Sequence, residues 1–206
     1  MAPRAVPSVL LDTARLQEEV ARLGREVARD HPDGVLLVGV LKGALIFLSD
    51  LVRAVQGVPV EVDFISISRY APDSGRVKIL QDLRTDILGR DVVVVEDVVD
   101  TGLTLTYLLS CLRERAPRSV EVCALIDRPE RRIVPVDVRY RGIEADGDVF
   151  ALGYGLHFRD LYRNLPFVVR GERDALLEQP DRYVADLYGR RGSGGLPASA
   201  GAGSCA

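Results

Sequence analysis

The stretch that most constrains this chain covers residues 92–112 and reads as a buried strand, a polar loop and a helix. It begins with four consecutive valines, and an unbroken β-branched run is typical of a strand buried on both faces in a parallel sheet. Glu96 and Asp97 follow, and then Asp100-Thr101-Gly102 leads into a helix-like run over 105–112. We therefore expect a strand-loop-helix unit of an α/β fold.

The loop of this unit carries groups that suit a sugar phosphate. Ligands of parallel α/β sheets bind at the carboxyl ends of the strands, and a short loop entering a helix offers N–H groups and a dipole to a phosphate. Gly102 lets the backbone approach closely, and Thr101 and Thr104 add hydroxyl donors. Glu96 and Asp97 suit a magnesium-bound sugar diol. Taken alone, these residues also fit an ordinary turn with a capping side chain.

The combination of a β-run, Glu-Asp, two apolar residues, Asp-Thr-Gly and Thr resembles the phosphoribosyl pyrophosphate (PRPP) signature of type I phosphoribosyltransferases. It is similar in particular to the hypoxanthine-guanine phosphoribosyltransferase family. The resemblance implies the type I phosphoribosyltransferase fold, an α/β architecture with a mostly parallel central sheet, flanking helices and a small hood. It makes Asp100 the general acid/base, and Glu96 and Asp97 the ligands of Mg²⁺. The PRPP-binding residues are then Glu96, Asp97, Asp100, Thr101, Gly102, Leu103 and Thr104.

The resemblance also predicts the domain boundaries. We expect a phosphoribosyltransferase domain over residues 1–171, with a hood built from the N-terminal segment and residues 133–171. Residues 172–206 are expected to form an extension that is partly helical, over 174–188 with Pro180 interrupting the helix. The end of this extension is rich in Gly, Ser and Ala, which predicts disorder.

A second loop carries one of the few lysines of the chain. Lysine occurs only at positions 42 and 78, and all other basic residues are arginines. The run Val35–Leu41 predicts a buried strand, and Lys42-Gly43 follows it. This resembles the family's Leu-Lys-Gly loop, which holds pyrophosphate and often contains a cis peptide before the lysine. The pyrophosphate-binding residues implied by the resemblance are Lys42, Gly43, Arg163, Ser68, Arg69 and Tyr70, and the last three begin a mobile loop in which Arg69 departs from the family.

The predicted base site contains two further departures. Arg128 follows the strand predicted over 120–127, where the family has a lysine that contacts the exocyclic oxygen of the base, and Arg132 matches a nearby family arginine. Phe150 matches the aromatic residue that stacks on the base. His157 replaces an aspartate that helps to hold a second magnesium ion, so this departure weakens the expectation of a second metal. The implied base-binding residues are Arg128, Phe150, Ala151, Leu156 and His157.

The rest of the chain is assigned from hydrophobic periodicity and turn residues. His31 falls in a Pro/Gly turn and is expected to be a turn residue rather than a ligand, and residues 1–8 to be a loose leader. The other predicted elements are helices over 12–30, 45–55 and 105–112, and strands over 58–67, 77–80, 136–140 and 149–155.

Composition excludes several classes of protein. The net charge of −3 gives no general case for nucleic-acid or membrane affinity, and no apolar run reaches the roughly 20 residues of a membrane span. The amino terminus lacks a signal-peptide core. The three cysteines show no metal-ligand spacing. We expect a cytoplasmic protein and, from the family resemblance, a homodimer or homotetramer.

The sequence therefore predicts phosphoribosyl transfer from PRPP to a ring nitrogen of a hypoxanthine- or guanine-type purine, with Mg²⁺. One alternative is the same reaction on a purine analogue such as a 7-deazapurine, because Arg128 and His157 both flank the expected base position. A second alternative is a regulator that binds PRPP or a nucleotide without catalysis. Asp100, Lys42 and the acidic net charge argue against the second, and the sequence does not identify the base.

Overall fold

The computed structural model describes residues 7–68, 77–145 and 149–189 of the 206-residue chain. The chain divides into a large unit, Gln17–Gly147, and a small unit that joins Met1–Leu16 to Asp148–Ala206. Arg69, Tyr70 and the expected disordered tail lie outside the described residues. None of the helices in the described ranges has the length and apolar character that crossing a membrane requires.

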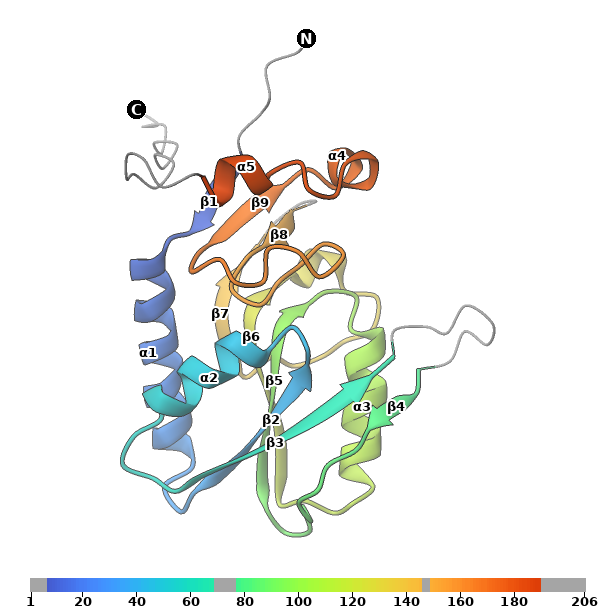
Figure 1. The fold of residues 1–206 in the computed structure, drawn as a ribbon. Coiled ribbons are helices and arrows are strands. Elements are labelled where there is room, and N and C mark those ends of the chain that lie inside the picture. Colours follow the sequence, from blue (N-terminus) through green and yellow to red (C-terminus); the bar gives the residue numbers. More distant parts are fainter. Residues whose placement is uncertain (1–6, 69–76, 146–148, 190–206) are drawn as a thin grey trace, which may run out of the picture. The chain divides into compact units, whose positions relative to one another are not determined.

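The large unit is built on a six-stranded sheet in the order β4-β3-β2-β5-β6-β7 (Figure 1). All neighbours pair in parallel except β3 and β4, so the sheet is mostly parallel as expected. The strands are β2 (Val35–Leu41), β3 (Val60–Ile67), β4 (Ile79–Gln81), β5 (Asp91–Val99), β6 (Ser119–Asp127) and β7 (Tyr140–Glu144).

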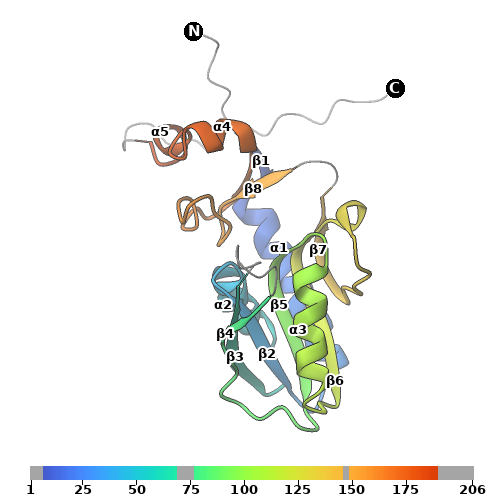
Figure 2. The same cartoon turned by 90° about the vertical axis from the view of Figure 1, so that its right-hand side faces the viewer.

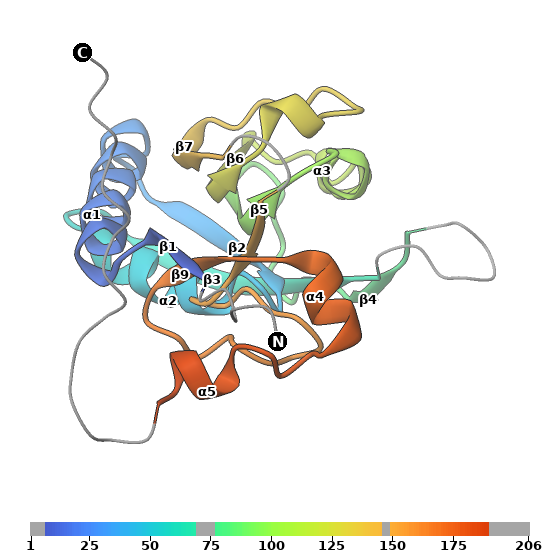
Figure 3. The same cartoon turned by 90° about the horizontal axis from the view of Figure 1, so that it is seen from above.

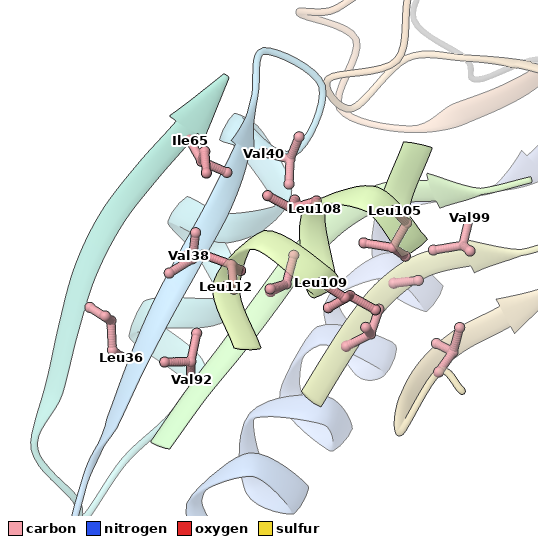
Figure 4. Packing of buried hydrophobic residues seen from close by; sticks show 14 of the residues in the cluster. Leu36, Val38, Val40, Ile65, Val92, Val99, Leu105, Leu108, Leu109 and Leu112 are labelled. Carbon is pink, nitrogen blue, oxygen red and sulfur yellow. The ribbon is translucent and has the colours of Figure 1, made fainter. Parts of the chain in front are cut away.

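Helices cover both faces of this sheet, which explains why β2 and β5 carry unbroken apolar runs. The helix α3 (Leu103–Arg113) packs its leucines on one face, against β2, β3, β5 and β6 (Figure 4). On the opposite face lie α2 (Leu45–Ala54) and the helix α1 (Thr13–Asp30) (Figure 3). The valines at 92–95 are fully buried between these layers.

The small unit holds a three-stranded antiparallel sheet in the order β1-β9-β8. Its strands are β1 (Ser8–Leu11), β8 (Phe150–Leu152) and β9 (Val168–Gly171). The expectation of a loose leader over residues 1–8 is therefore wrong at Ser8, which pairs with Arg170. The strand β9 was not predicted.

Two short helices complete the small unit (Figure 2). They are α4 (Arg173–Glu178) and α5 (Val184–Leu187), and Pro180 lies between them, so the interrupted helix expected over 174–188 is confirmed. Leu176 and Tyr183 are fully buried in a cluster with Leu152 and Val169 of the small sheet. This helical part of the chain therefore belongs to the core of the small unit.

The last strand of the large sheet corrects a prediction. The strand expected over 136–140 instead begins at Tyr140 and pairs in parallel with β6, so it belongs to the large sheet and not to a hood. Val136 and Val138 suggested the strand because they alternate with polar residues. In the structure they pack on the core beneath α3 without strand pairing.

His31 is more than a turn residue. It is 5% exposed, and its Nε2 lies 3.2 Å from Glu121 Oε2 and 3.1 Å from the hydroxyl oxygen of Tyr140. The Tyr140 hydroxyl donates to the same Glu121 oxygen at 2.9 Å. Burial and this acidic partner raise the pKa of Tyr140 well above its usual range. These contacts join the residue that follows α1 to the first residues of β6 and β7.

The small-unit core yields a prediction from two adjacent leucines. Leu176 is fully buried against Gly171, whereas Leu177 is 52% exposed. Leu176→Ala should lower the free energy of unfolding by about 2–5 kcal/mol because it leaves a cavity. Leu177→Ala should change it by no more than about 0.5 kcal/mol. Urea unfolding followed by circular dichroism measures both, and equal effects would contradict the assignment of α4 to the core.

Candidate active site

Three loops follow the carboxyl ends of three adjacent parallel strands. Lys42 and Gly43 follow β2, Asp100 to Gly102 follow β5, and Arg128 follows β6. Because these strands are neighbours in the order β2-β5-β6, their carboxyl ends meet at one edge of the sheet. The topology therefore brings together residues that are almost 90 positions apart in the chain.

The loop between β5 and α3 turns on Gly102. This residue has φ +82° and precedes the first residue of α3, and its carbonyl accepts the N–H of Thr106 at 2.9 Å. The first N–H groups of a helix have no partner within the helix, so they are suited to an anion. The segment over residues 100–102, which we call the phosphate loop, thus joins a strand to a helix as expected.

The structure adds a second reason for glycine at position 102, beside the expected close approach to a phosphate. A Cβ atom there would lie 2.4 Å from the carbonyl oxygen of Val134, which is closer than real Cβ atoms approach. Together with the positive φ, this contact requires glycine for the packing of the protein itself. A Gly102→Val variant would disturb the fold even without a ligand. It could therefore not separate a loss of phosphate binding from a loss of structure.

The segment 128–134 lies against the phosphate loop, and we call it the clasp. The Arg128 N–H donates to Val99 O at 3.0 Å. The N–H groups of Ile133 and Val134 both donate to Thr101 O, at 2.9 and 3.1 Å. These backbone bonds fix the clasp along residues 99–101, so the two segments form one structure.

Asp100 is held at two points by arginines of the clasp. Arg131 Nε donates to Asp100 Oδ1 at 2.7 Å, and Arg132 Nη1 donates to the Asp100 carbonyl at 2.6 Å. Arg128 Nη1 lies 3.9 Å from Oδ1. The Asp100 side chain is 39% exposed, so a ligand can reach it. Sequence reasoning chose Arg128 and Arg132 but missed Arg131.

Asp127 at the end of β6 supports this arrangement. It is 1% exposed and forms ion pairs with Arg132 and with Arg141, whose Nε lies 2.8 Å from Asp127 Oδ2. A buried carboxylate requires such partners, because an uncompensated buried charge is costly. The Arg132 guanidinium therefore donates to the Asp127 carboxylate through one terminal nitrogen and to the Asp100 carbonyl through the other.

The loop after β2 passes close to the Asp97 carboxylate of β5. The Leu41–Lys42 peptide bond is cis, as the family resemblance implies. Asp97 is 7% exposed, and its Oδ1 accepts the Val98 N–H at 2.8 Å. A Cβ atom on Gly43 would lie 1.8 Å from Asp97 Oδ2, so only glycine fits beside this carboxylate. Glu96 and Asp97 lie within β5, which runs on to Val99, and not after its end as expected.

Ser68 is the last described residue before Arg69 and Tyr70. Its N–H donates to Lys78 O at 2.8 Å, and its Oγ accepts the Lys78 N–H at 3.1 Å. This pair of bonds joins the two chain segments beside β3 and β4. Ser68 is thus positioned by a hairpin contact.

The remaining predicted residues belong to the small unit. His157 is exposed, and its Nδ1 accepts the Asp160 N–H at 3.0 Å, a bond that an aspartate oxygen could also accept. Arg163 donates to the Gly155 carbonyl at 2.6 Å and pairs with Asp160 at 2.8 Å. Phe150 packs edge-on against Phe158, with ring centroids 5.8 Å apart. Ala151 and Leu156 lie between Phe150 and His157 in the sequence, and they are partly buried and buried respectively.

The residues that could hold a metal ion are few. Within the described ranges no group of three or more His, Cys, Asp or Glu side chains is arranged to hold one. Glu96 and Asp97 supply carboxylate oxygens, which suit Mg²⁺ when a substrate supplies further oxygens. Asp97 is buried and Glu96 is partly buried.

Comparisons with known proteins point to one family. The phosphoribosyl transferase domain family matches residues 8–159. A hypoxanthine-guanine phosphoribosyltransferase of Mycobacterium avium is 44% identical over 176 residues, covering 81% of this chain and 86% of that protein. One from Bacillus subtilis (strain 168) is 38% identical over 172 residues, covering 82% and 94%. A Bacillus anthracis hypoxanthine-guanine phosphoribosyltransferase structure, with HEPES in its active site, has a TM-score of 0.77 and 37% identity, covering 82% and 100%.

The contact between Gly43 and Asp97 gives a prediction. Gly43→Ala should weaken PRPP binding at least about tenfold, because the new methyl group must displace the Asp97 carboxylate or the loop. Gly89→Ala is the control: no atom lies within 4 Å of its Cβ position, and its φ of +67° costs stability only. Calorimetric titration with PRPP measures both, and normal affinity in a folded Gly43→Ala protein would contradict the assignment.

Proposed function

Because the chain belongs to the hypoxanthine-guanine phosphoribosyltransferase family, we propose that it transfers the phosphoribosyl group of PRPP to a ring nitrogen of a hypoxanthine- or guanine-type base. The products are a nucleoside 5′-monophosphate and pyrophosphate, so the enzyme is a pentosyltransferase of purine salvage. The observation that carries the assignment is Asp100, an accessible carboxylate at the phosphate loop. Its Oδ1 accepts a hydrogen bond from Arg131, and its backbone carbonyl accepts one from Arg132.

In this proposal the two ends of PRPP bind to different loops. The backbone of residues 101–104 anchors the 5′-phosphate at the amino end of α3, where the helix dipole favours negative charge. Lys42 and Gly43 bind the pyrophosphate. They are assisted by Arg163, Ser68, Arg69 and Tyr70.

Asp100 accepts and returns the proton of the base. The attacking ring nitrogen forms a bond to C1 of the ribose while the bond from C1 to pyrophosphate breaks. A carboxylate beside the base can accept or return the proton of the second ring nitrogen as this happens. Arg128 donates to the exocyclic oxygen of the base. The family resemblance assigns Phe150, Ala151, Leu156 and His157 to base binding as well.

The family generally uses a divalent metal ion, and we propose Mg²⁺ held by Glu96 and Asp97. Mg²⁺ is commonly bound by one or two carboxylates together with substrate phosphates, which matches these two side chains. When bound, the ion neutralises charge on the pyrophosphate leaving group. The proposal also includes a cytoplasmic homodimer or homotetramer with no nucleic-acid or membrane partner, which sedimentation and cell fractionation would test.

A purine analogue such as a 7-deazapurine is a second candidate substrate, supported by Arg128 and His157 but not by the relatives named above. Arg and Lys are not equivalent donors at a site that needs one compact group. A panel of bases with PRPP, with mass detection of the nucleotide, separates the two candidates. Turnover of hypoxanthine or guanine supports the main proposal, and turnover of the analogue alone would replace it.

The role of Asp100 gives the next prediction. Asp100→Asn should lower kcat on hypoxanthine or guanine by about 10²–10⁴-fold, the usual contribution of a general acid/base. PRPP binding should survive, because the backbone of the loop and not this carboxylate anchors the phosphate. Steady-state kinetics and calorimetry measure the two effects, and an unchanged kcat would remove Asp100 from the mechanism.

His157 gives a prediction about the metal. Its Nδ1 accepts the Asp160 N–H, and imidazole is in any case a poor ligand for Mg²⁺. His157→Asp should therefore strengthen the dependence of turnover on Mg²⁺ and raise the turnover of hypoxanthine and guanine. His157→Asn is the control, because it keeps a hydrogen-bond acceptor without adding a negative charge.

Kinetics of the wild-type enzyme can contradict this prediction about His157. If it already converts hypoxanthine or guanine with kcat/KM in the usual range of about 10⁴–10⁸ M⁻¹s⁻¹, and His157→Asp brings no improvement, then His157 is a neutral variant. The salvage function would stand, and the prediction about a second metal ion would be wrong.

A further inference from the structure

The contact between Arg131 and Asp100 has a function of its own. We propose that Arg131 is a positioning residue that orients the Asp100 carboxylate toward the proton of the base, an inference that rests on the proposed function. The bond from Arg131 Nε to Asp100 Oδ1 is 2.7 Å long, in the range of strong charge-assisted hydrogen bonds.

The two oxygens of Asp100 have different surroundings. Oδ1 is bonded to Arg131 and lies 3.9 Å from Arg128 Nη1. Within the described part of the chain, Oδ2 accepts no hydrogen bond. A carboxylate oxygen that accepts a charge-assisted hydrogen bond is a weaker base than the other oxygen, so Arg131 favours Oδ2 as the oxygen that meets the base proton.

The backbone on both sides of Arg131 is fixed, which makes the contact a property of the fold. Arg131 ends the 3₁₀ helix η1 (Pro129–Arg131), and its N–H donates to Arg128 O at 3.1 Å. The next residue, Arg132, is bonded to both Asp127 and the Asp100 carbonyl. Arg131 therefore lies on a segment that is already bonded, through Arg132, to the loop that contains Asp100.

These proposed roles, with Asp100 as the acid/base and Arg131 as the residue that orients it, match the general pattern of a catalytic base oriented by a further group. The guanidinium suits the role because its donors are planar and its charge is permanent. The Arg131 side chain is 38% exposed, so replacing it removes a surface-accessible group and leaves no buried charge behind. The variants below should therefore fold.

The test is a double-mutant cycle between Arg131→Met and Asp100→Asn. Arg131→Met alone should lower kcat by about 10–100-fold, part of the contribution of the acid/base that it orients. In the Asp100→Asn background the same change should lower kcat by less than about threefold, because the carboxylate to be oriented is absent. KM for PRPP should stay within about threefold in both cases.

Two further variants sharpen the test. Arg131→Lys keeps the charge without the planar donor and should recover only part of the lost kcat. Arg115→Met is the matched control, because Arg115 pairs with Asp82 at a similar distance of 2.8 Å on the surface. It should leave kcat unchanged.

The opposing outcomes separate this inference from the proposed function. An equal loss of kcat in both backgrounds would mean that Arg131 acts independently of Asp100. A rise in KM for PRPP with unchanged kcat would make Arg131 a phosphate ligand instead, and an unchanged enzyme would remove any role. If the wild type turns over no purine, or Asp100→Asn has no effect, then the proposed function itself has failed.

Discussion

The backbone contact between the clasp and the phosphate loop is the constraint on which the rest of the site depends. Two N–H groups, those of Ile133 and Val134, bind one carbonyl, that of Thr101. Gly102 must then pass beneath the Val134 carbonyl with a positive φ, and only glycine can do so. The start of α3, with the N–H groups that we propose bind a phosphate, is thereby fixed by a segment that follows β6.

The charges of the clasp follow from the same contact. Asp127 is buried at the end of β6, and its pairs with Arg132 and Arg141 compensate its charge. Of the two arginines only Arg132 is itself largely buried, so it is the partner whose loss would be most costly for the Asp127 charge. These ion pairs hold Arg132, the neighbour of Arg131 in the chain, and so help to place Arg131 beside Asp100.

The sequence predicted the parts of this structure that local chemistry determines. Buried strands β2, β5 and β6 follow from β-branched runs, and Asp100 and the loop before α3 follow from the motif. The short strands β1 and β9 were missed because four-residue strands carry little periodicity and are stabilised by pairing with each other. Val136 and Val138 alternate like a strand, but Val138 is buried in the core cluster that contains the α3 leucines and Val136 packs against this cluster. The contacts of Arg131 with Asp100 and of Gly43 with Asp97 join distant segments, so no local pattern could reveal them.

The central claim is that three loops of the large unit form one PRPP site. Hydrogen exchange measured by mass spectrometry, with and without PRPP and Mg²⁺, tests it most directly, because exchange reports the protection of individual segments. We expect PRPP to slow exchange in all three peptides that cover residues 41–46, 96–104 and 128–134. Protection that leaves the clasp unchanged while the phosphate loop is protected, or that spares all three segments, would contradict it.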